Sequence, residues 1–336
     1  MTGAALALRV IRVLAGVPGQ AGFGGDGGPA SDALLYGPTG VTVDEAGNVY
    51  IADAHNQRVR RVDARTGRIA TVAGNGEEGF GGDGGPALSA ALFFPLGVAV
   101  DADGNLYIAD SQNHRLRRVD GRTGVITTFA GGKRGYGGDG GPATSARLAL
   151  PSGVLVARDG RILTNDFMNN RIRAIDTQGI ITTLVSGETP GGMEGPHGIG
   201  LDPQGRLHMT DYRNQRVLRF DPEAGRVVTF AGGNGRGFGG DGGPATMAQF
   251  NNVHGVAFDP RGDAYIADYG NRRVRRVDAE TGLITTAVGS GERGPSGAGG
   301  PPVQAALGLP SGVAVDAGRR RLYIPDYEAH CVWMVE

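Results

Sequence analysis

The chain has 336 residues, with 33 basic and 34 acidic side chains and a formal net charge of −1, so neither a nucleic-acid nor a membrane partner is expected from charge. Its 62 glycines and 18 prolines approach the level typical of low-complexity disorder, but 40% of the residues are apolar and glycine recurs at fixed intervals, which excludes disorder and collagen. The single cysteine, Cys331, excludes an internal disulfide, and no apolar run reaches the ~18 residues of a membrane span.

One repeat recurs along the whole chain. Residues 38–74 read PTGVTVDEAGNVYIADAHNQRVRRVDARTGRIATVAG, and residues 95–131 read PLGVAVDADGNLYIADSQNHRLRRVDGRTGVITTFAG. Further copies begin at positions 151, 196, 253 and 310, and the glycines that they share are spaced by 57, 56, 45, 57 and 57 residues. Six units leave no room for a second domain, so residues 1–336 are expected to form a single one.

Each unit is predicted to contain four short strands. In the first unit they are GVTVD, NVYIAD, RVRRVD and IATVAG, separated by turns such as Thr66-Gly67. Four strands per unit without helical periodicity predict an all-β fold, a six-bladed propeller with four antiparallel strands per blade.

The two ends of the chain are predicted to meet. The sixth unit ends after its third strand, and residues 11–16 (IRVLAG) match residues 69–74 (IATVAG). The N-terminal residues 1–16 are therefore expected to supply the outer strand of the last blade and to close the ring. Because the apolar residues 4–8 continue directly into this strand, we do not expect a signal peptide. We therefore expect a cytoplasmic location.

The pattern P-x-G-V-x-V-D-x-x-G-N-x-Y-I-A-D-x-x-N-x-R-V resembles the NHL repeat of six-bladed propellers over nearly the whole chain. The loop GFGGDGGPA at residues 22–30, 79–87 and 237–245, with Tyr136 replacing the phenylalanine at 135–143, resembles loops common in bacterial NHL proteins. This resemblance implies the fold but not the function, because such propellers serve as RNA-binding, protein-binding and enzymatic modules.

Residues that recur in every blade are interpreted as scaffold. The Gly-rich loops have no Walker lysine, and their single aspartates have no neighbouring carboxylates, so we expect glycine turns between blades rather than phosphate or calcium sites. In each blade an Asp and an Arg are expected to fix a tight loop through hydrogen bonds and a charge-assisted pair. These residues are Asp53, Asp110, Asp166, Asp211, Asp268 and Asp326, with Arg58, Arg115, Arg171, Arg216, Arg273 and, in the sixth unit, Cys331.

Three positions of the repeat vary between blades. They are the residue before the first-strand glycine and the residues on either side of the loop aspartate, and in a propeller all three are expected to surround one mouth of the central channel. The variable residues that could form a site there are Asn165, Phe167, His197, Thr210, Tyr212, His254, Tyr269 and Tyr327.

The connection into the fourth blade is short. Residues 186–195 read SGETPGGMEG in place of the Gly-rich loop, which explains the 45-residue spacing. Either this is drift in the length of a surface loop, which costs little, or it opens a gap in the rim beside His197 and brings Glu194 near it.

His197 and His254 occupy equivalent positions in adjacent blades, so their imidazoles are expected to converge. They could hold a divalent metal, zinc or calcium, with Glu194 completing the ligand set, or one could act as a general base; alternatively both only form local hydrogen bonds. Gly-Pro-His-Gly around His197 resembles a zinc-ligand position of the peptidyl-hydroxyglycine amidating lyases, which share this type of propeller.

Two functions remain open. The first is a monomeric small-molecule enzyme, a lyase, hydrolase or cyclase, for which a concave pocket would be the sign. The second is a module that binds a peptide or protein on the same face through Tyr212, Tyr269 and Tyr327, for which a flat aromatic surface would be the sign. The catalytic candidates are His197, His254, Glu194, Tyr212 and Tyr269, and the substrate-binding candidates are Asn165, Phe167, Tyr327, Thr210 and Asn252.

Overall fold

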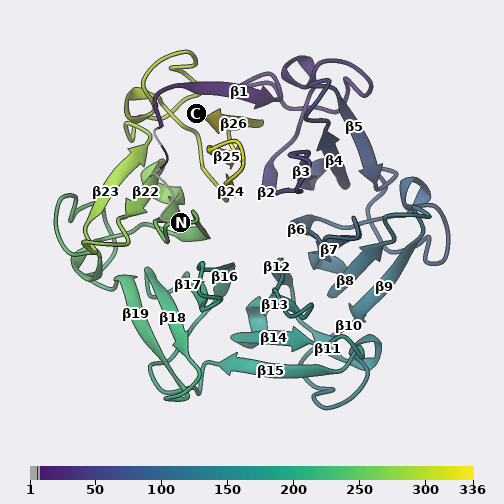
Figure 1. The fold of residues 1–336 in the computed structure, drawn as a ribbon. Helices are drawn as coiled ribbons and strands as arrows, with labels where there is room; N and C mark the ends of the chain where they lie inside the picture. The colour runs from purple at the N-terminus through teal and green to yellow at the C-terminus, as the bar shows by residue number, and fades with distance from the viewer. Residues whose placement is uncertain (1–5, 7) are drawn as a thin grey trace.

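Six antiparallel sheets of four strands each surround a central channel in the computed structural model, which describes residue 6 and residues 8–336 (Figure 1). Blades 1 and 2 consist of β2 (Pro38–Val43), β3 (Val49–Asp53), β4 (Arg58–Val62) and β5 (Ile69–Ala73), and of β6 (Pro95–Val100), β7 (Leu106–Asp110), β8 (Arg115–Val119) and β9 (Ile126–Gly131). Blades 3 and 4 consist of β12 (Pro151–Val156), β13 (Ile162–Asp166), β14 (Arg171–Ile175) and β15 (Ile181–Ser186), and of β16 (Pro196–Leu201), β17 (Leu207–Asp211), β18 (Arg216–Asp221) and β19 (Arg226–Gly232). Blade 5 consists of β20 (Val253–Phe258), β21 (Ala264–Asp268), β22 (Arg273–Val277) and β23 (Ile284–Val288), and blade 6 of β24 (Ala314–Asp316), β25 (Arg321–Asp326), β26 (Cys331–Val335) and β1 (Ile11–Ala15). The predicted six-bladed propeller is confirmed.

Short elements occupy the connections. Single 3₁₀ turns follow the second strand in four blades, and five more lie at the ends of the loops that enter blades 1, 2, 3, 5 and 6. They are η2 (Ala54–Asn56), η4 (Ser111–Asn113), η6 (Phe167–Asn169) and η8 (Tyr269–Asn271), then η1 (Ala30–Asp32), η3 (Ala87–Ser89), η5 (Ala143–Ser145), η7 (Ala245–Met247) and η9 (Pro302–Gln304). A two-residue pair, β10 (Lys133–Arg134) with β11 (Arg147–Leu148), completes the set. Within the described residues no helix has the length and apolar character of a membrane span.

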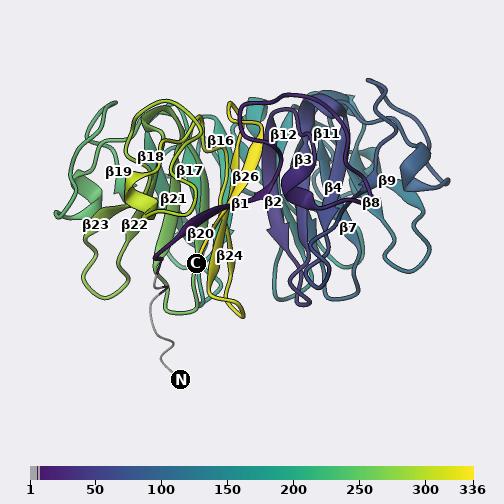
Figure 2. The same ribbon diagram turned by 90° about the horizontal axis from the view of Figure 1, so that it is seen from above.

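The N-terminal strand closes the ring, as expected. β1 pairs antiparallel with β26, with Ile11 opposite Val335 and Val13 opposite Trp333. Figures 1 and 2 show this first strand along the outer edge of the last blade. Ile11 and Ala15 are fully buried, so the closing strand contributes apolar contacts as well as backbone hydrogen bonds.

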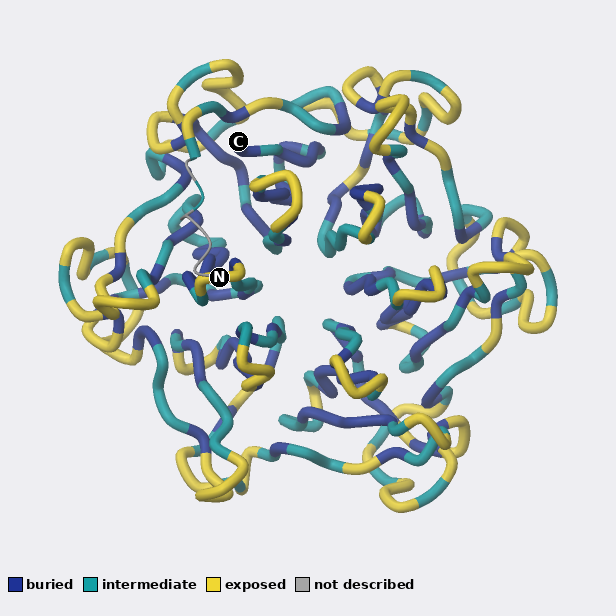
Figure 3. The backbone as a smooth tube through the Cα atoms, in the orientation of Figure 1, coloured by how far each residue is buried: buried dark blue, intermediate teal, exposed yellow. Residues whose placement is uncertain are grey.

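The hydrophobic core lies between neighbouring blades. One cluster joins Val59 and Ala73 of blade 1 to Val98 and Ile108 of blade 2, and the other blade junctions are built in the same way. Each sheet is covered on both faces by the neighbouring blades, so its strands are largely buried. Exposed residues are concentrated in the outer loops and turns (Figure 3).

Glycine is required where the innermost strands meet. A Cβ atom on Gly40 would lie 2.3 Å from the carbonyl oxygen of Leu96 in the next blade, and one on Gly198 would lie 2.1 Å from that of His254. Any side chain at these positions would push the blades apart, which explains why this glycine recurs in all six units.

The predicted partner of the loop aspartate is wrong in most blades. Asp53 pairs with Arg60 at 3.4 Å, not with Arg58, and both side chains are fully buried. Arg60 also pairs with Asp26 of the Gly-rich loop at 2.6 Å. The same triads are Arg117 with Asp110 and Asp83, Arg173 with Asp166 and Asp139, and Arg275 with Asp268 and Asp241.

Arg58 instead forms the outer part of the same arrangement. Its guanidinium donates to the carbonyl oxygen of Asn56 at 2.9 Å and lies 3.8 Å from the ring centroid of Phe23. Each Gly-rich loop in blades 1, 2, 3 and 5 is therefore held at two points: its aspartate pairs with a buried arginine, and its aromatic ring packs on a half-buried one. The loops are glycine turns with a structural role.

Blades 4 and 6 lack this arrangement, and in both the partner residues change together. In blade 4, which has the short connection, Leu218 replaces the buried arginine and Arg216 pairs with Asp211 at 2.8 Å, as the sequence analysis predicted for that residue. In blade 6, Trp333 donates from Nε1 to Asp326 at 3.0 Å, and Ala298 replaces the loop aspartate. The buried charge pair is thus kept only where the loop supplies its second carboxylate.

The arginine pairs lead to a stability prediction. Arg117→Ala is expected to lower the free energy of unfolding by about 3–5 kcal/mol, because it leaves the buried carboxylate of Asp110 without its counter-charge. Arg115→Ala, the matched outer substitution, is expected to cost about 1–3 kcal/mol, the usual range for a lost hydrogen-bonding partner. Urea unfolding of both variants makes the comparison, and an equal or larger cost for Arg115→Ala would contradict the assignment.

Removal of residues 1–16, of which 1–5 and 7 lie outside the described residues, is expected to destabilise the protein. The deletion removes β1, uncovers the edge of β26 and exposes an unpaired strand to aggregation. Thermal melting and size-exclusion chromatography of the truncated chain measure the effect. An unchanged melting temperature would contradict the ring closure.

Candidate functional site at the channel mouth

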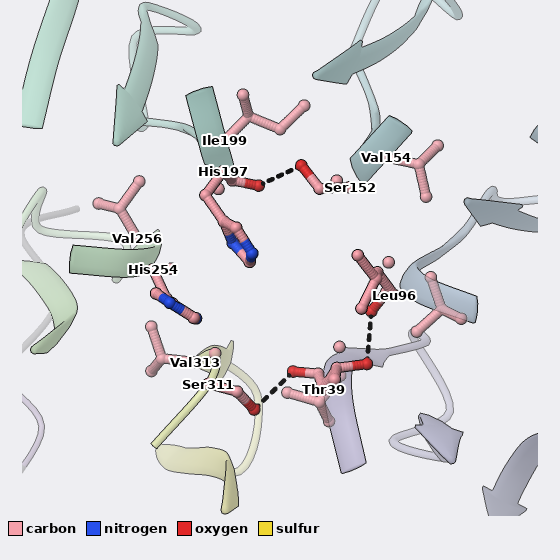
Figure 4. A pocket seen from close by; sticks show the side chains of 18 of the residues that line it. Thr39, Leu96, Ser152, Val154, His197, Ile199, His254, Val256, Ser311 and Val313 are labelled. Carbon is pink, nitrogen blue, oxygen red and sulfur yellow. Dashed lines mark hydrogen bonds between the residues drawn. The ribbon is translucent and has the colours of Figure 1, made fainter. Parts of the chain in front are cut away.

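Hydroxyl groups join the innermost strands around the channel mouth. Thr39 Oγ1 donates to the carbonyl oxygen of Leu96 at 3.0 Å, and Ser152 Oγ donates to that of His197 at 2.9 Å. Ser311 Oγ donates to the carbonyl oxygen of Thr39 at 3.0 Å, across the junction of blades 6 and 1 (Figure 4). These three hydroxyl bridges each connect one blade to the next, so the Ser and Thr residues at this position stabilise the ring.

In blade 4 the same bridge comes from another strand. Thr210 on β17 donates from Oγ1 to the carbonyl oxygen of His254 at 2.9 Å and accepts from the backbone N–H of Gly198 at 2.8 Å. Thr210 is fully buried and does not line the channel, so its hydroxyl is occupied by this bridge. Because Thr210 supplies the bridge from blade 4 to blade 5, the side chain of His197 has no such structural task.

The two predicted histidines do converge. Their rings stack with centroids 4.1 Å apart and an interplanar angle of 28°, and His254 stacks on Tyr269 at 4.0 Å and 10°. Figure 4 shows both imidazoles projecting into the channel. Nδ1 of His254 is buried without a hydrogen-bond partner, and no hydrogen bond of the His197 ring falls within the described residues.

Both imidazoles are neutral at pH 7. Burial lowers the pKa of His197 to about 4. Burial, and then the adjacent His197, lowers the pKa of His254 well below its ordinary value. Burial also raises the pKa of Tyr269 to about 12, so its hydroxyl stays protonated. The group offers polar atoms without formal charge.

Two further aromatic residues complete this side of the mouth. The ring of Phe167 lies edge-on to His197 at 5.9 Å, and the ring of Tyr212 lies 6.2 Å from His197 and 5.6 Å from His254. The structure therefore brings together five of the predicted site residues, from blades 3, 4 and 5.

The opposite side of the mouth carries a second polar pair. The hydroxyl of Tyr327 lies 2.6 Å from Nε2 of His55, and His55 contacts Tyr36 at 4.5 Å and Phe94 at 5.0 Å between ring centroids. Tyr327 was predicted, whereas His55 and Phe94 were missed. Both occupy positions that also vary from blade to blade, the second residue after the loop aspartate and the residue before the first strand, and this variation was the available signal.

A cavity of roughly 300 Å³ lies between the two sides. His197, His254, Tyr269, Tyr327 and Phe94 are part of its wall, and the hydroxyls of the bridging residues face it. Deeper in the channel a ring of branched aliphatic side chains, one from each blade, narrows the cavity: Val41, Val98, Val154, Ile199, Val256 and Val313. The mouth is thus concave, with a polar and aromatic rim above an apolar floor.

Six of the predicted site residues do not line this cavity, namely Thr210, Phe167, Tyr212, Asn165, Asn252 and Glu194. Asn165 is fully buried and its amide has no hydrogen-bond partner within the described residues. Asn252 has a positive φ of 57° in the turn before β20, and its backbone N–H donates to Oε1 of Gln215. Glu194 pairs with Arg213 at 3.2 Å and lines a separate groove of about 450 Å³ at the junction of blades 3 and 4. The short connection does leave a gap, but His197 does not line it.

The donor set at the mouth does not fit a zinc or calcium ion. Among the described residues no group of three or more His, Cys, Asp or Glu side chains is arranged to hold a metal. The cavity wall offers two stacked imidazoles and no carboxylate, whereas zinc sites usually have at least three protein ligands and calcium prefers oxygen donors.

Comparison with protein families identifies the repeat. The teneurin NHL domain model matches residues 13–78, 74–136 and 132–192, which together exceed half of the chain, and the NHL repeat model matches residues 250–276.

Curated relatives are longer than this chain. NHL repeat-containing protein 2 of Gallus gallus is 25% identical over 299 residues, which cover 77% of this chain and 41% of that protein. Protein SUPPRESSOR OF QUENCHING 1, chloroplastic, of Arabidopsis thaliana is 33% identical over 147 residues, covering 41% of this chain and 14% of that protein. The chain therefore spans less than half the length of these relatives.

Solved structures with the same fold differ in function. A streptogramin B lyase has a TM-score of 0.61 at 12% identity, with 99% of each chain covered. A gluconolactonase from Xanthomonas campestris has a TM-score of 0.63 at 18% identity, covering 100% of this chain and 93% of that one. An auxiliary nutrient binding protein from Bacteroides thetaiotaomicron has a TM-score of 0.70 at 17% identity, covering 97% and 76%. At these identities the likeness is one of fold.

The lowered histidine pKa values predict a pH effect on stability. Between about pH 4 and 6.5 the unfolded chain binds protons at these histidines that the folded state does not, so their contribution to stability is complete above pH 6.5 and is lost as the pH falls toward 4. Between pH 7.5 and pH 4.5 the melting temperature of the His197→Phe variant is therefore expected to fall by less than that of the parent protein.

The parent protein is the reference at both pH values. Asp53, Asp110 and Asp268, whose pKa values burial raises to about 6, act in the opposite sense but are present in both proteins. Thermal melting at the two pH values measures the difference. Parallel pH profiles for the two proteins would show that His197 is not held in its neutral form by folding.

Proposed function

The chain belongs to the NHL-repeat family, and we propose that within this family it is a small-molecule enzyme whose reaction takes place at the channel mouth, beside His197 and His254. The reaction classes that suit the site are lyase, hydrolase and cyclase reactions that begin with removal of a proton from the substrate or from water.

One observation carries this proposal. Three blades place Ser or Thr at the mouth and use the hydroxyl to bridge to the next blade, but blades 4 and 5 place histidines there. Blade 4 obtains its bridge from Thr210 instead, so the ring does not depend on the imidazole of His197. Two polar side chains without partners in a cavity are available to a ligand.

The protonation states support acid–base chemistry. The neutral imidazole of His197 has a free lone pair at pH 7; its pKa of about 4 makes it a weak base, and the imidazolium formed transiently during a reaction is a strong acid toward a leaving group. Tyr269, whose pKa burial raises to about 12, remains a hydrogen-bond donor next to His254. In this proposal His197 or His254 carries the proton, Tyr269 donates to the substrate, and Tyr212 and Phe167 restrict the positions of the rings.

The second candidate is a binding module without catalysis. Its support is that apolar side chains are exposed on this face, Tyr36 at 41% and Met168 at 45%, and that one solved propeller of the same fold is a nutrient binding protein. The concave cavity with its aliphatic floor favours the enzyme over a module for a protein partner, because protein interfaces do not require an enclosed pocket of this kind.

A substrate screen tests the proposal. Lactones, esters and cyclic depsipeptides are incubated with the protein, and products are detected by mass spectrometry. For a compound that is converted, His197→Phe and His254→Phe are each expected to lower kcat/KM by roughly 10²-fold or more, the usual worth of a positioned acid–base group.

His208→Phe is the matched control. His208 is also buried with a pKa lowered to about 4, but it packs against Phe230 and Phe258 and does not line the channel. It is expected to keep the parent activity. Equal losses in all three variants, or full activity in the two channel variants, would refute the assignment of the site, and binding without conversion of any compound would favour the second candidate.

A further inference from the structure

We infer that this site takes an uncharged small molecule with a compact, largely apolar body, and that it rejects anions and cations of the same shape. This inference rests on the proposed function, because it concerns the class of substrate that the cavity at the channel mouth would bind.

The wall of the cavity carries no formal charge. Its side chains are those of Val, Ile, Leu, Phe, Ser, Thr, Tyr and neutral His, and no Asp, Glu, Lys or Arg is among them. An ion entering this cavity would lose water without meeting a counter-charge, which is costly in proportion to its burial. The two imidazoles cannot supply that charge, because burial already disfavours their protonation.

Two sets of charged groups near the mouth are paired with each other. Arg213, beside Tyr212, pairs with Glu194 at 3.2 Å. Glu328, beside Tyr327, pairs with Arg272 at 3.7 Å and also with Arg293. Neither group lines the cavity, so a ligand would have to break an existing ion pair to recruit one of them.

The positions of the polar atoms define the ligand further. They lie at the rim, on the rings of His197 and His254 and at the hydroxyl of Tyr327 beside His55; Nδ1 of His254 is itself buried and is not one of them. Each neutral imidazole offers one donor and one acceptor. The floor offers only the aliphatic ring that includes Val98, Ile199 and Val256. A ligand that satisfies both regions places a carbonyl, ester or hydroxyl group at the rim and an apolar body below it, and the volume of roughly 300 Å³ limits that body to about one or two rings, at the small end of ligand pockets.

Three probes with one bicyclic skeleton separate charge from shape: chroman-4-one, which is neutral, chroman-2-carboxylate and 4-aminochroman. Dissociation constants are measured at pH 7.5 by ligand-observed NMR on the full chain. The neutral ketone is expected to bind at least tenfold more tightly than either ion. Equal or tighter binding of an ion, or no binding of all three probes at millimolar concentration, would overturn the inference.

A substitution in the wall provides the internal control. Leu96 lines the cavity, and only its backbone carbonyl takes part in the hydroxyl bridge, so its side chain can be changed without loss of that bridge. Leu96→Lys is expected to raise the affinity for the carboxylate at least tenfold, whereas Leu96→Gln is expected not to. No gain in Leu96→Lys would show that the carboxylate is not excluded by the lack of a counter-charge in this cavity.

None of these binding measurements requires turnover. If the neutral probe binds selectively but the substrate screen yields no product, the proposed enzyme activity is refuted and the inference about the ligand class is retained. Turnover of a charged compound that depends on His254 would do the reverse.

Discussion

The close approach of the six innermost strands is the constraint on which the rest of the molecule depends. Gly40 and Gly198 show its strength, since a Cβ atom on either would lie within 2.3 Å of a carbonyl oxygen in the next blade. Backbones this close can be joined by short side chains, and Ser152 and Thr39 do so. The diameter of the channel, and with it the size of the cavity, follows from this packing.

The outer part of each blade is constrained by a buried carboxylate. The loop aspartate that fixes a tight turn is buried between sheets, and in four blades a buried arginine supplies its counter-charge. Arg60 can do so only because the Gly-rich loop supplies Asp26 on its other side. Where the loop is lost or altered, as in blades 4 and 6, the buried arginine is replaced by Leu218 or Trp333, so no arginine is buried without its second carboxylate. Asp211 then pairs with Arg216, and Asp326 accepts from Trp333 Nε1.

The candidate site lies where the innermost strands carry histidine in place of a bridging Ser or Thr. A hydroxyl that bridges a blade junction can come from the first strand or, as with Thr210, from the second. This redundancy allows the first-strand position of blade 4 to carry His197 at little cost to the fold. His254 occupies the same position in the next blade, so the two rings stack across the junction and form a neutral polar surface in the channel.

The sequence by itself determined the repeat, the strand order within each blade, the closing role of residues 11–15 and the convergence of His197 with His254, because all of these follow from periodicity and from the equivalence of the blades. The sequence did not determine which side chains form hydrogen bonds and ion pairs with one another. Arg58 lies opposite Asp53 in the strand register, yet Arg60 makes the buried pair, since the path of the Gly-rich loop places Phe23 on one arginine and Asp26 on the other. His55 and Tyr327, 272 residues apart, likewise meet only because the ring closes and makes the first and last blades neighbours.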